Sequence, residues 1–501
     1  MEREQWSSRR GFVLAAIGSA IGLGNIWRFP YIAYKNGGGA FLIPYIFALL
    51  TTGLSFVALE FIIGKTYRGS APLSYSRINK HMEFVGWWQF AISFVIMTYY
   101  AVILAWTLSY IGFSFTLAWG NKTSDFFYSS YINSIDAPSL TNFGGIVPKV
   151  CIPLIIIWFI TLAIAYRGVK KGIEKMSSIA IPVLVVLFIV FVIRAVTMPG
   201  AVNGLNTFFE PKWYKLAKPE IWQSAYSQIF YSLSLAMGIM ITYSSYLPRE
   251  SDTTNNAYIS AFANSGFELL AGIGIFSALG FMAAVSNQPI DKLAKGGIGL
   301  AFVVIPQIIN NLPAPHLFGI IFFVCLFIAG ITSLISLLEV CIAGASEKFG
   351  WERKRTVVII GIIATTVSIA YTTRGGVYLL DVVDNFVNNF GVLASAIFEI
   401  ILIVWVYKKM NPLMKEANRF SQIRLGNYWK ISLGLITPVM LIVILVSSFF
   451  EDAKTVYGGY PANFVGVFGW GLAVALVVFA VLIPLIKWKG VKADEKEEKW
   501  L

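Results

Sequence analysis

The sequence predicts an all-α, polytopic membrane protein built from twelve transmembrane helices. Of its 501 residues, 57% are hydrophobic and only 13% are charged, and the mean hydropathy is +0.70. The apolar residues collect in long stretches, each near or above the ~20 residues that a helix needs to cross a membrane. The net charge of +13 is spread over short loops between these stretches. This distribution places the chain in a lipid bilayer and argues against a nucleic-acid partner.

The twelve predicted spans follow one another with mostly short connections. They cover residues 11–34, 40–64, 87–117, 147–166, 173–197, 221–247, 257–285, 316–346, 356–373, 377–407, 430–450 and 463–486. Most Lys and Arg residues fall on one side when both termini are placed in the cytoplasm, as the positive-inside rule requires. Two runs of basic residues on the cytoplasmic side are interpreted as topology signals. They are Arg167, Lys170, Lys171 and Lys175, and Lys348, Arg353, Lys354 and Arg355. Short outer loops without a cysteine pair favour a bacterial inner (cell) membrane.

The first span contains residues that are unusual in a membrane helix. Between Gly18 and Pro30 it carries three glycines, an asparagine and an arginine. Hydrocarbon cannot satisfy free backbone groups, so a helix broken here must be buried in protein or line a cavity. Unwound amides suit a carboxylate, and unwound carbonyls suit a small hard cation. The sequence therefore predicts a binding site at mid-membrane depth.

The spans divide into two halves of opposite orientation. Span six, which opens the second half, has clustered hydroxyls and a glycine in residues 228–238. Helix packing through small residues is the alternative interpretation of this span alone. Two interrupted spans in corresponding positions are typical of an inverted repeat with its site between the repeats. The predicted units are an N-terminal cytoplasmic tail (1–10), the first repeat (11–197), an outer loop (198–220), the second repeat (221–407), spans eleven and twelve (408–486) and a charged cytoplasmic tail (487–501).

The composition gives little support for an enzyme or for a metal centre. The chain has two histidines and three cysteines, and the cysteines Cys151, Cys325 and Cys341 fall in apolar spans without pairing by spacing. Neither a nucleophile with an adjacent base nor a cluster of metal ligands is recognisable. We therefore expect a transport protein rather than an enzyme. A membrane sensor that binds its ligand without transporting it is the alternative.

Five motifs resemble the neurotransmitter:sodium symporter family, in particular its bacterial leucine and related amino-acid transporters. They are Gly-Leu-Gly-Asn-Ile-Trp-Arg-Phe-Pro at 22–30, Asn-Gly-Gly-Gly-Ala-Phe at 36–41, Arg167-Gly168 to Glu174, Gln-Ile-Phe at 228–230 and Ala-Gly-Ile-Thr-Ser at 329–333. The resemblance extends from the N-terminus to span eleven. It implies a 5+5 inverted-repeat bundle with broken helices 1 and 6, and sodium-driven import of an amino acid.

The resemblance implies two sodium sites, which would use hard oxygen ligands. The first would take oxygens of Ala20, Asn25, Ser232, Asn264 and the substrate carboxylate. The second would take the carbonyls of Gly18, Ile21 and Ala329 with the hydroxyls of Thr332 and Ser333. A carboxylate shared between sodium and substrate would couple the binding of the two.

The resemblance also implies a substrate site between the broken helices and span three. The residues that would contact the substrate are Ala20, Gly22, Leu23, Gly24, Ile96, Tyr100, Tyr231, Ser232, Ser234, Met237, Ser333 and Leu337. Monoamine transporters of the family have an aspartate at the position of Gly22, so glycine leaves room for a substrate with its own carboxylate. An apolar wall, narrowed by Leu334, would favour a small or medium hydrophobic or neutral amino acid. This wall comprises Ile96, Tyr231, Met237, Leu334 and Leu337.

The same resemblance implies roles for charged residues inside the spans. The outer gate would be the pair Arg28 and Asp384, and the inner gate would be Arg3 and Glu347 with Trp6 and Tyr246 beside them. Chloride-dependent relatives have a neutral residue at the position of Glu268, so this carboxylate would replace chloride and make transport chloride-independent. Glu339 is left without a role. The chain is expected to work by alternating access, and a homodimer is left open as its oligomeric form.

Overall fold

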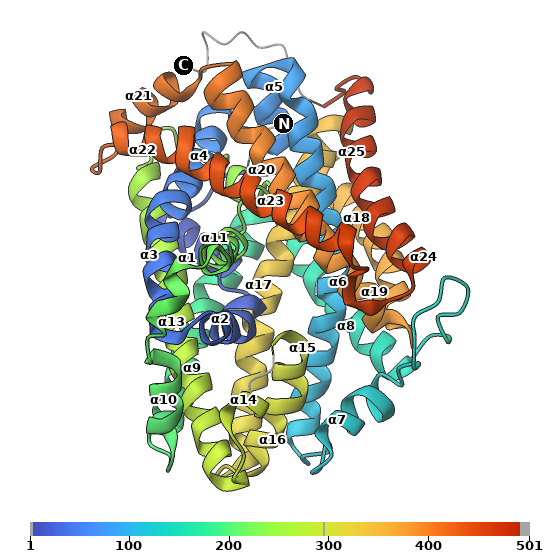
Figure 1. The fold of residues 1–501 in the computed structure, drawn as a ribbon. Helices are drawn as coiled ribbons and strands as arrows, with labels where there is room; N and C mark the ends of the chain where they lie inside the picture. Colours follow the sequence, from blue (N-terminus) through green and yellow to red (C-terminus); the bar gives the residue numbers. More distant parts are fainter. Residues whose placement is uncertain (1–3, 294–295, 491–501) are drawn as a thin grey trace.

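The computed structural model describes residues 4–293 and 296–490, which form a bundle of helices (Figure 1). Among these residues, β structure is limited to one isolated antiparallel bridge between Ile146 and Thr373. The predicted all-helical membrane fold is confirmed. The α-helices are α1 (Arg9–Ala20), α2 (Leu23–Lys35), α3 (Leu42–Ala48), α4 (Leu54–Tyr67), α5 (Ala71–Ile78), α6 (Glu83–Ser114), α7 (Thr123–Asp125), α8 (Pro148–Tyr166), α9 (Lys175–Val196), α10 (Ala201–Phe209), α11 (Pro219–Ser232), α12 (Ile239–Ser244), α13 (Thr253–Ser286), α14 (Ile290–Leu293), α15 (Gly297–Gly299), α16 (Ile305–Asn310), α17 (Pro315–Phe349), α18 (Arg353–Ile369), α19 (Gly376–Phe386), α20 (Leu393–Ile400), α21 (Met410–Phe420), α22 (Asn427–Ile431), α23 (Thr437–Lys454), α24 (Ala462–Val465) and α25 (Leu472–Leu482).

Ten helical segments of the described chain are long and apolar enough to cross a membrane, and they correspond to ten of the predicted spans. They cover Gly38–Tyr67, Lys80–Ser114, Pro148–Tyr166, Val169–Val196, Thr253–Ser286, Pro315–Phe349, Arg353–Thr372, Gly376–Val406, Asn427–Gly459 and Ala462–Leu485. Of the other two predicted spans, the first is a bent pair of helices that together are long and apolar enough to cross a membrane, whereas span six, with helices of 14 and six residues, is not among these segments. In the first, α1 and α2 meet at a bend of 51°. In span six, α11 ends at Ser232 and α12 begins at Ile239.

Two long continuous helices, α6 and α17, pack along each other through the middle of the bundle (Figure 1). α17 begins with Pro315, whose ring presets the backbone torsion of a first helical turn. It ends where Gly350 adopts the left-handed conformation, with φ at 70°. Helices α1, α9 and α13 pack against one another on one side of this pair. These packed helices hold the two broken spans in the protein interior.

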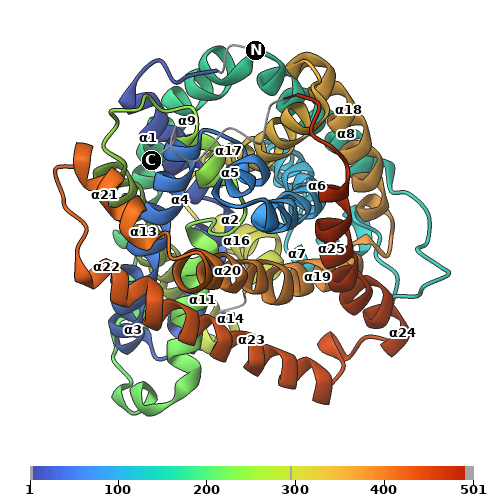
Figure 2. The same ribbon diagram turned by 90° about the horizontal axis from the view of Figure 1, so that it is seen from above.

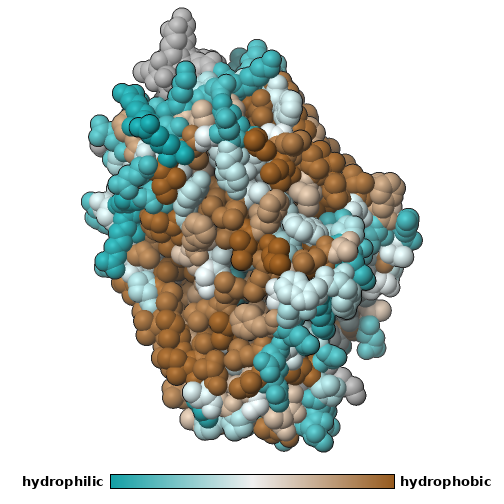
Figure 3. All heavy atoms as spheres, turned by 60° about the vertical axis from the view of Figure 1, so that its left-hand side comes forward, coloured by the Kyte–Doolittle hydropathy of each residue, from teal (hydrophilic) through white to brown (hydrophobic). Residues whose placement is uncertain are grey.

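A broad apolar surface covers the middle of the molecule, with hydrophilic residues gathered toward its two ends (Figure 3). Large apolar side chains are exposed along the outer helices, for example Phe159 on α8 at 73% and Val474 on α25 at 62%. Water would not favour so large a contiguous apolar surface, whereas acyl chains match it. Viewed along the bundle, α18, α23 and α25 lie at the rim while α5 and α17 lie near the centre (Figure 2).

Both described ends of the chain lie at the same end of the bundle. The Trp6 backbone N–H donates to the carbonyl of Tyr246 at 3.3 Å, next to the start of the α12–α13 connection. Near the other terminus, Lys489 N–H donates to the carbonyl of Lys348 at 2.9 Å, in the last turn of α17. This is the end that the charge distribution predicts to be cytoplasmic, and we call it the inner end. The predicted tail 487–501 is described only to residue 490.

Candidate functional site

The break in the first span results from two hydrogen bonds that replace helical ones. The Gly22 N–H donates to Oδ1 of Asn25 at 2.9 Å, and the Leu23 N–H donates to the Tyr100 hydroxyl at 3.3 Å. In an unbroken helix these two N–H groups would bond to the carbonyls of Gly18 and Ser19. Those carbonyls are therefore released from the α-helical pattern in the middle of the bundle, and that of Ser19 accepts instead from Ser234 Oγ at 3.3 Å and Ser333 Oγ at 3.2 Å.

The break in span six exposes backbone groups of a second segment, residues 233–238. Ser234 and Ala236 have positive φ angles of 53° and 55°, which side-chain-bearing residues seldom adopt. The surrounding protein compensates, because the Ala236 N–H donates to Glu60 Oε1 at 3.0 Å and Ser93 Oγ donates to the Met237 carbonyl at 2.6 Å. Such strained segments concentrate at binding sites. Because of this non-helical segment, span six consists of two short helices, α11 and α12, and not of one continuous helix.

The two breaks face a common cavity of about 540 Å³. All the residues predicted to contact substrate line it: Ala20, Gly22, Leu23, Gly24, Ile96, Tyr100, Tyr231, Ser232, Ser234, Met237, Ser333 and Leu337. They come from five separate helices and the segment after α11, so the fold has brought together residues more than 300 positions apart. A cavity of this size can hold a small organic molecule.

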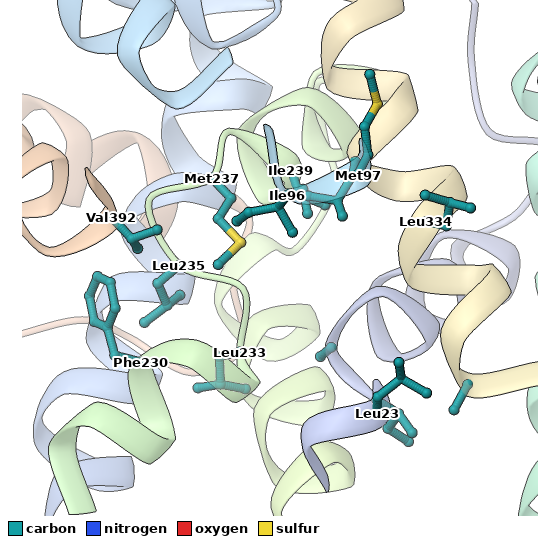
Figure 4. Packing of buried hydrophobic residues seen from close by; sticks show 14 of the residues in the cluster. Leu23, Ile96, Met97, Phe230, Leu233, Leu235, Met237, Ile239, Leu334 and Val392 are labelled. Atoms are coloured by element: carbon teal, nitrogen blue, oxygen red, sulfur yellow. The ribbon is translucent and has the colours of Figure 1, made fainter. Parts of the chain in front are cut away.

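One side of the cavity is polar and another is apolar. Two hydroxyls crowd Gly22, because a Cβ atom built there would lie 3.2 Å from both Ser333 Oγ and Tyr100 Oη. A Cβ at Gly24, in contrast, would meet nothing within 4 Å. On the apolar side, Met237 and Ile96 lie next to each other in the close-up view (Figure 4). Polar groups at one end and apolar groups at the other suit an amphipathic small molecule.

Leu334 does not line the cavity, which corrects the predicted apolar wall. It is fully buried on α17, and Figure 4 shows it away from Met237 and Ile96. Ser333 and Leu337 do line the cavity, and they are four residues apart. Residues four apart share one helix face, whereas the residue after Ser333 is turned by ~100°. Leu334 therefore packs between helices and leaves the wall to Ile96, Tyr231, Met237 and Leu337.

The residues of the first predicted sodium site form a buried chain of amides and a hydroxyl. Nδ2 of Asn25 donates to Oδ1 of Asn264 at 2.8 Å, and Nδ2 of Asn264 donates to Oγ of Ser232 at 3.1 Å. All three side chains are buried, on α2, α13 and α11. Together with Ala20, they place neutral hard oxygens close to the break in the first span. Such oxygens suit an alkali cation better than a transition metal.

The residues of the second predicted sodium site also lie close together. The carbonyl of Ala329 accepts from Thr332 Oγ1 at 3.0 Å and from Ser333 Oγ at 3.1 Å. A Cβ atom at Gly18 would lie 3.4 Å from Cβ of Thr332, so α1 and α17 touch here. Ile21 follows the end of α1 with an extended ψ of 100°. Within the described residues, no group of three or more His, Cys, Asp or Glu side chains could hold a metal ion.

Arg28 and Asp384, the predicted outer gate, both line the cavity but do not pair in this conformation. No ion pair within 4.0 Å joins them in the described structure. The Arg28 guanidinium lies over the ring of Tyr231 at 4.5 Å, and Asp384 Oδ1 accepts from the Tyr99 hydroxyl at 2.6 Å. The cavity continues past them to Tyr128 and Tyr460 in the outer connections. The predicted gate residues therefore do not separate the cavity from these outer connections.

The inner side is closed by the N-terminal segment. Trp6 is buried, and its Nε1 donates to the carbonyl of Tyr243 at 2.8 Å. The Tyr246 hydroxyl donates to Glu339 Oε1 at 2.8 Å. Glu347 accepts from the backbone N–H of Ser70 at 2.9 Å and from its hydroxyl at 2.5 Å. Arg3, the predicted partner of Glu347, lies outside the described residues.

Arg353 is a functional candidate that the sequence analysis missed. Its guanidinium binds Glu339 through both terminal nitrogens, at 2.8 and 2.6 Å, and Glu339 is fully buried. It also donates to the carbonyl of Ala165 and lies 3.4 Å from Glu4. Arg353 belongs to a basic run interpreted as a topology signal. The unassigned carboxylate of Glu339 was the signal that could have found it, because a charge buried in a membrane span needs a partner.

Glu268 is fully buried between three helices. It accepts from Gln228 Nε2 at 2.6 Å and from the Tyr45 hydroxyl. A second buried carboxylate, Glu399, accepts from Gln89 Nε2 at 2.8 Å and was not singled out in the sequence. Gln228 lines the main cavity, so the hydrogen bond to Glu268 starts at the cavity wall.

Comparison with known proteins identifies the family. The profile of the sodium:neurotransmitter symporter family matches residues 3–137 and 120–491. An uncharacterized sodium-dependent transporter of Methanocaldococcus jannaschii is 40% identical over 497 residues, which cover 98% of this chain and 99% of the relative. The sodium-dependent dopamine transporter of Caenorhabditis elegans is 30% identical, covering 99% and 89%. The sodium- and chloride-dependent glycine transporter 2 of Xenopus laevis is also 30% identical, covering 97% and 69%. The chain therefore belongs to the sodium:neurotransmitter symporter family.

Proposed function

We propose that this member of a sodium-dependent transporter family imports a small or medium-sized hydrophobic or neutral amino acid together with sodium. The observation that carries the proposal is the cavity between two unwound segments, with polar groups at one end and an apolar wall at the other. Alternating access would start from the outward-open form. Substrate and sodium would close the outer gate, and the inner end would then open, because ligands shift such an equilibrium only by differential affinity.

A zwitterion fits the polar end better than a plain amine does. Its carboxylate would meet the backbone N–H groups at the start of α2, around Leu23 and Gly24, and the Tyr100 hydroxyl. The N-terminus of a helix favours negative charge. Its ammonium group would meet carbonyls near Ala20 and Tyr231. The carboxylates that line the cavity, Asp381 and Asp384, belong to the segment with the predicted outer gate, so in this proposal the substrate supplies the carboxylate at the polar end.

Two sodium ions would bind on either side of the first break. The chain of Asn25, Asn264 and Ser232 would hold one ion beside the substrate carboxylate, and Thr332 and Ser333 would hold the other against α1. A carboxylate that ligates sodium directly makes each ligand raise the affinity of the other by the same factor. Sodium would then drive accumulation of the amino acid.

Replacing Gly22 with aspartate should weaken amino-acid binding by at least about a hundredfold. The new Cβ would start 3.2 Å from Ser333 Oγ and Tyr100 Oη, and its carboxylate would occupy the place of the substrate's own. Like charges in a water-poor site repel by several kcal/mol, and 1.4 kcal/mol is a tenfold change in affinity. Competition against a labelled amino acid in detergent measures this. The control variant is Gly112→Ala, because a Cβ atom at Gly112 meets nothing within 4 Å and binding should stay unchanged. Unchanged binding in Gly22→Asp would mean that the substrate carboxylate does not bind beside Gly22.

Transport should be independent of chloride in the wild type and dependent on it in Glu268→Ser. The buried carboxylate supplies one negative charge near Gln228, and serine removes that charge while leaving space for an anion. Uptake with all chloride replaced by gluconate measures the difference. We expect a loss of less than twofold in the wild type and of about tenfold or more in the variant. Equal sensitivity of both proteins to gluconate would contradict the role of Glu268.

The proposed function is tested by uptake of labelled glycine, alanine, leucine, tyrosine and tryptophan into proteoliposomes. An inward sodium gradient is compared with choline. Sodium-dependent accumulation of one group supports the symporter and ranks the substrates by size. Binding without accumulation would favour a membrane sensor of the same fold, and the absence of both would contradict the substrate class.

A further inference from the structure

A second cavity, of about 670 Å³, lies at the inner end and is lined mainly by cations. Arg167, Lys170, Lys171 and Lys175 contribute four positive charges to it, and Glu174 contributes one negative charge. Nothing in the transport mechanism uses this cavity. The four cations have no ion-pair partner among the residues that the structure describes, so their charge is available to a ligand.

The single carboxylate of this cavity is already engaged by the protein. Glu174 accepts from the Ser7 backbone N–H at 2.8 Å, from the Ser7 hydroxyl at 2.5 Å and from the Ser8 hydroxyl at 2.9 Å. Its oxygens are thus turned toward the N-terminal segment and do not neutralise the lysines by direct contact. The cavity therefore keeps a strong preference for anions.

The backbone that carries these exposed cations is held in place rather than being a loose loop. Residues Val169–Glu174 form a π-helical turn that joins α8 to α9. A Cβ atom at Gly172 would lie 2.1 Å from the carbonyl of Ile164, so the turn packs directly on the end of α8. The backbone N–H of Val169 is bonded to Glu4. A fixed backbone keeps the four cations close together, which lowers the entropic cost of binding a ligand compared with a mobile loop.

Below the cations, α9 presents an apolar stripe to the bilayer. Its exposed residues are Ile179 (60%), Val183 (42%), Val186 (61%), Val190 (44%) and Ile193 (58%). These positions continue the helical spacing of Lys171 and Lys175, three or four residues apart, on one face of the helix. One side of the same helix thus offers positive charge at its inner end and apolar side chains along its length.

We propose that the basic cavity binds the phosphate group of an anionic phospholipid, whose acyl chains lie along the exposed face of α9. The occupant has the two properties that this surface matches, a negatively charged phosphate at headgroup level and hydrocarbon below it. A free phosphate ion would satisfy the cations but gain nothing from the stripe. The lipid would also join Ser7 of the N-terminal segment to the α8–α9 connection, and so stabilise the closed inner end.

The test measures binding to the purified full-length protein in detergent by isothermal titration calorimetry. The probes are dihexanoylphosphatidylglycerol, dihexanoylphosphatidylcholine, glycerophosphoglycerol and inorganic phosphate. We expect saturable binding of the first at one per chain, and binding at least about tenfold weaker for each of the others. Equal affinity for the zwitterionic lipid dihexanoylphosphatidylcholine, whose net charge is zero, would overturn the proposal. Equal affinity for inorganic phosphate or the headgroup alone would make the ligand a soluble phosphate rather than a lipid.

Charge-removal variants locate the site. One variant replaces all four cations of the basic cavity with glutamine (Arg167→Gln, Lys170→Gln, Lys171→Gln and Lys175→Gln). It should bind the anionic lipid at least about tenfold more weakly than the wild type. The matched control Lys408→Gln, Lys415→Gln, Arg424→Gln, Lys430→Gln removes the same charge from the same end and should change affinity less than twofold. An equal loss in both would mean general surface charge and would overturn the site. If the fourfold variant does not fold, a double variant replaces it. The affinity of Lys171→Gln, Lys175→Gln is then compared with that of the control Lys408→Gln, Lys415→Gln.

Discussion

Replacing Asn25 with alanine is expected to raise the sodium concentration for half-maximal uptake by at least about tenfold. Asn25 is buried, accepts from the Gly22 N–H at 2.9 Å and donates to Asn264 at 2.8 Å. Alanine would leave both partners buried without a bond, which costs ~1–3 kcal/mol for each. It would also remove an oxygen of the proposed first sodium site. Since 1.4 kcal/mol is a tenfold change, uptake at ordinary sodium concentrations should fall close to the choline background.

The measurement is uptake against sodium concentration, paired with labelled-sodium binding. Asn36→Ala is the matched control, because Asn36 lies at the other end of the same helix and its Nδ2 donates to the carbonyl of Ile32 at 2.9 Å. Its sodium dependence should stay within twofold of wild type. A change in amino-acid affinity in Asn25→Ala with an unchanged sodium dependence would contradict the sodium role and leave Asn25 as a support of the break.

Replacing Arg353 with alanine is expected to open the inner end of the transporter. Arg353, at the start of α18, binds both oxygens of the fully buried Glu339 and donates to the carbonyl of Ala165, so it ties α17 to the last turn of α8. Removing one partner of a buried pair leaves an uncompensated charge and costs ~3–5 kcal/mol. Water entering the inner pathway would relieve this cost by hydrating Glu339. A difference of that size is enough to reverse a two-state equilibrium of a few kcal/mol.

Ser336→Cys reports the opening, because Ser336 is buried beside Tyr243 in the closed inner pathway. With the native cysteines replaced, a charged thiol reagent should label this cysteine at least about tenfold faster when Arg353→Ala is present. Arg355→Ala removes a neighbouring exposed arginine that lies over Trp351, and it should leave the rate unchanged. Glu339→Gln added to Arg353→Ala should slow labelling again, since no charge remains buried. Equal labelling in all variants would mean that the pair does not hold the inner end closed.

The predicted site residues converge because the sequence carries strong local signals at each of them. Glycines and amides inside an apolar span are expensive in a membrane, so Gly22 and Asn25 could be singled out without a structure. The resemblance then named partners such as Tyr100 and Ser333, and these residues line one cavity with the two breaks. Their contacts with sodium and substrate stay predictions.

Residues whose role depends on a distant partner were harder to assign. Arg353 looked like any cytoplasmic arginine, and only packing places it against Glu339. Arg28 and Asp384 were predicted as a pair, but whether they touch depends on the conformational state, and in this one each has another partner. The four cations of the basic cavity likewise had a sufficient explanation in membrane topology.

The sequence by itself determined the membrane fold, the two interrupted spans and the residue types of the candidate site. It could do so because bilayer thickness and the cost of unsatisfied backbone groups act on contiguous residues. The tertiary structure alone decided which face Leu334 presents, which cation meets Glu339, that Arg28 and Asp384 have separate partners, and that Arg167, Lys170, Lys171 and Lys175 share a cavity. These depend on a helix rotation of ~100° per residue and on contacts between distant segments, neither of which a linear pattern records.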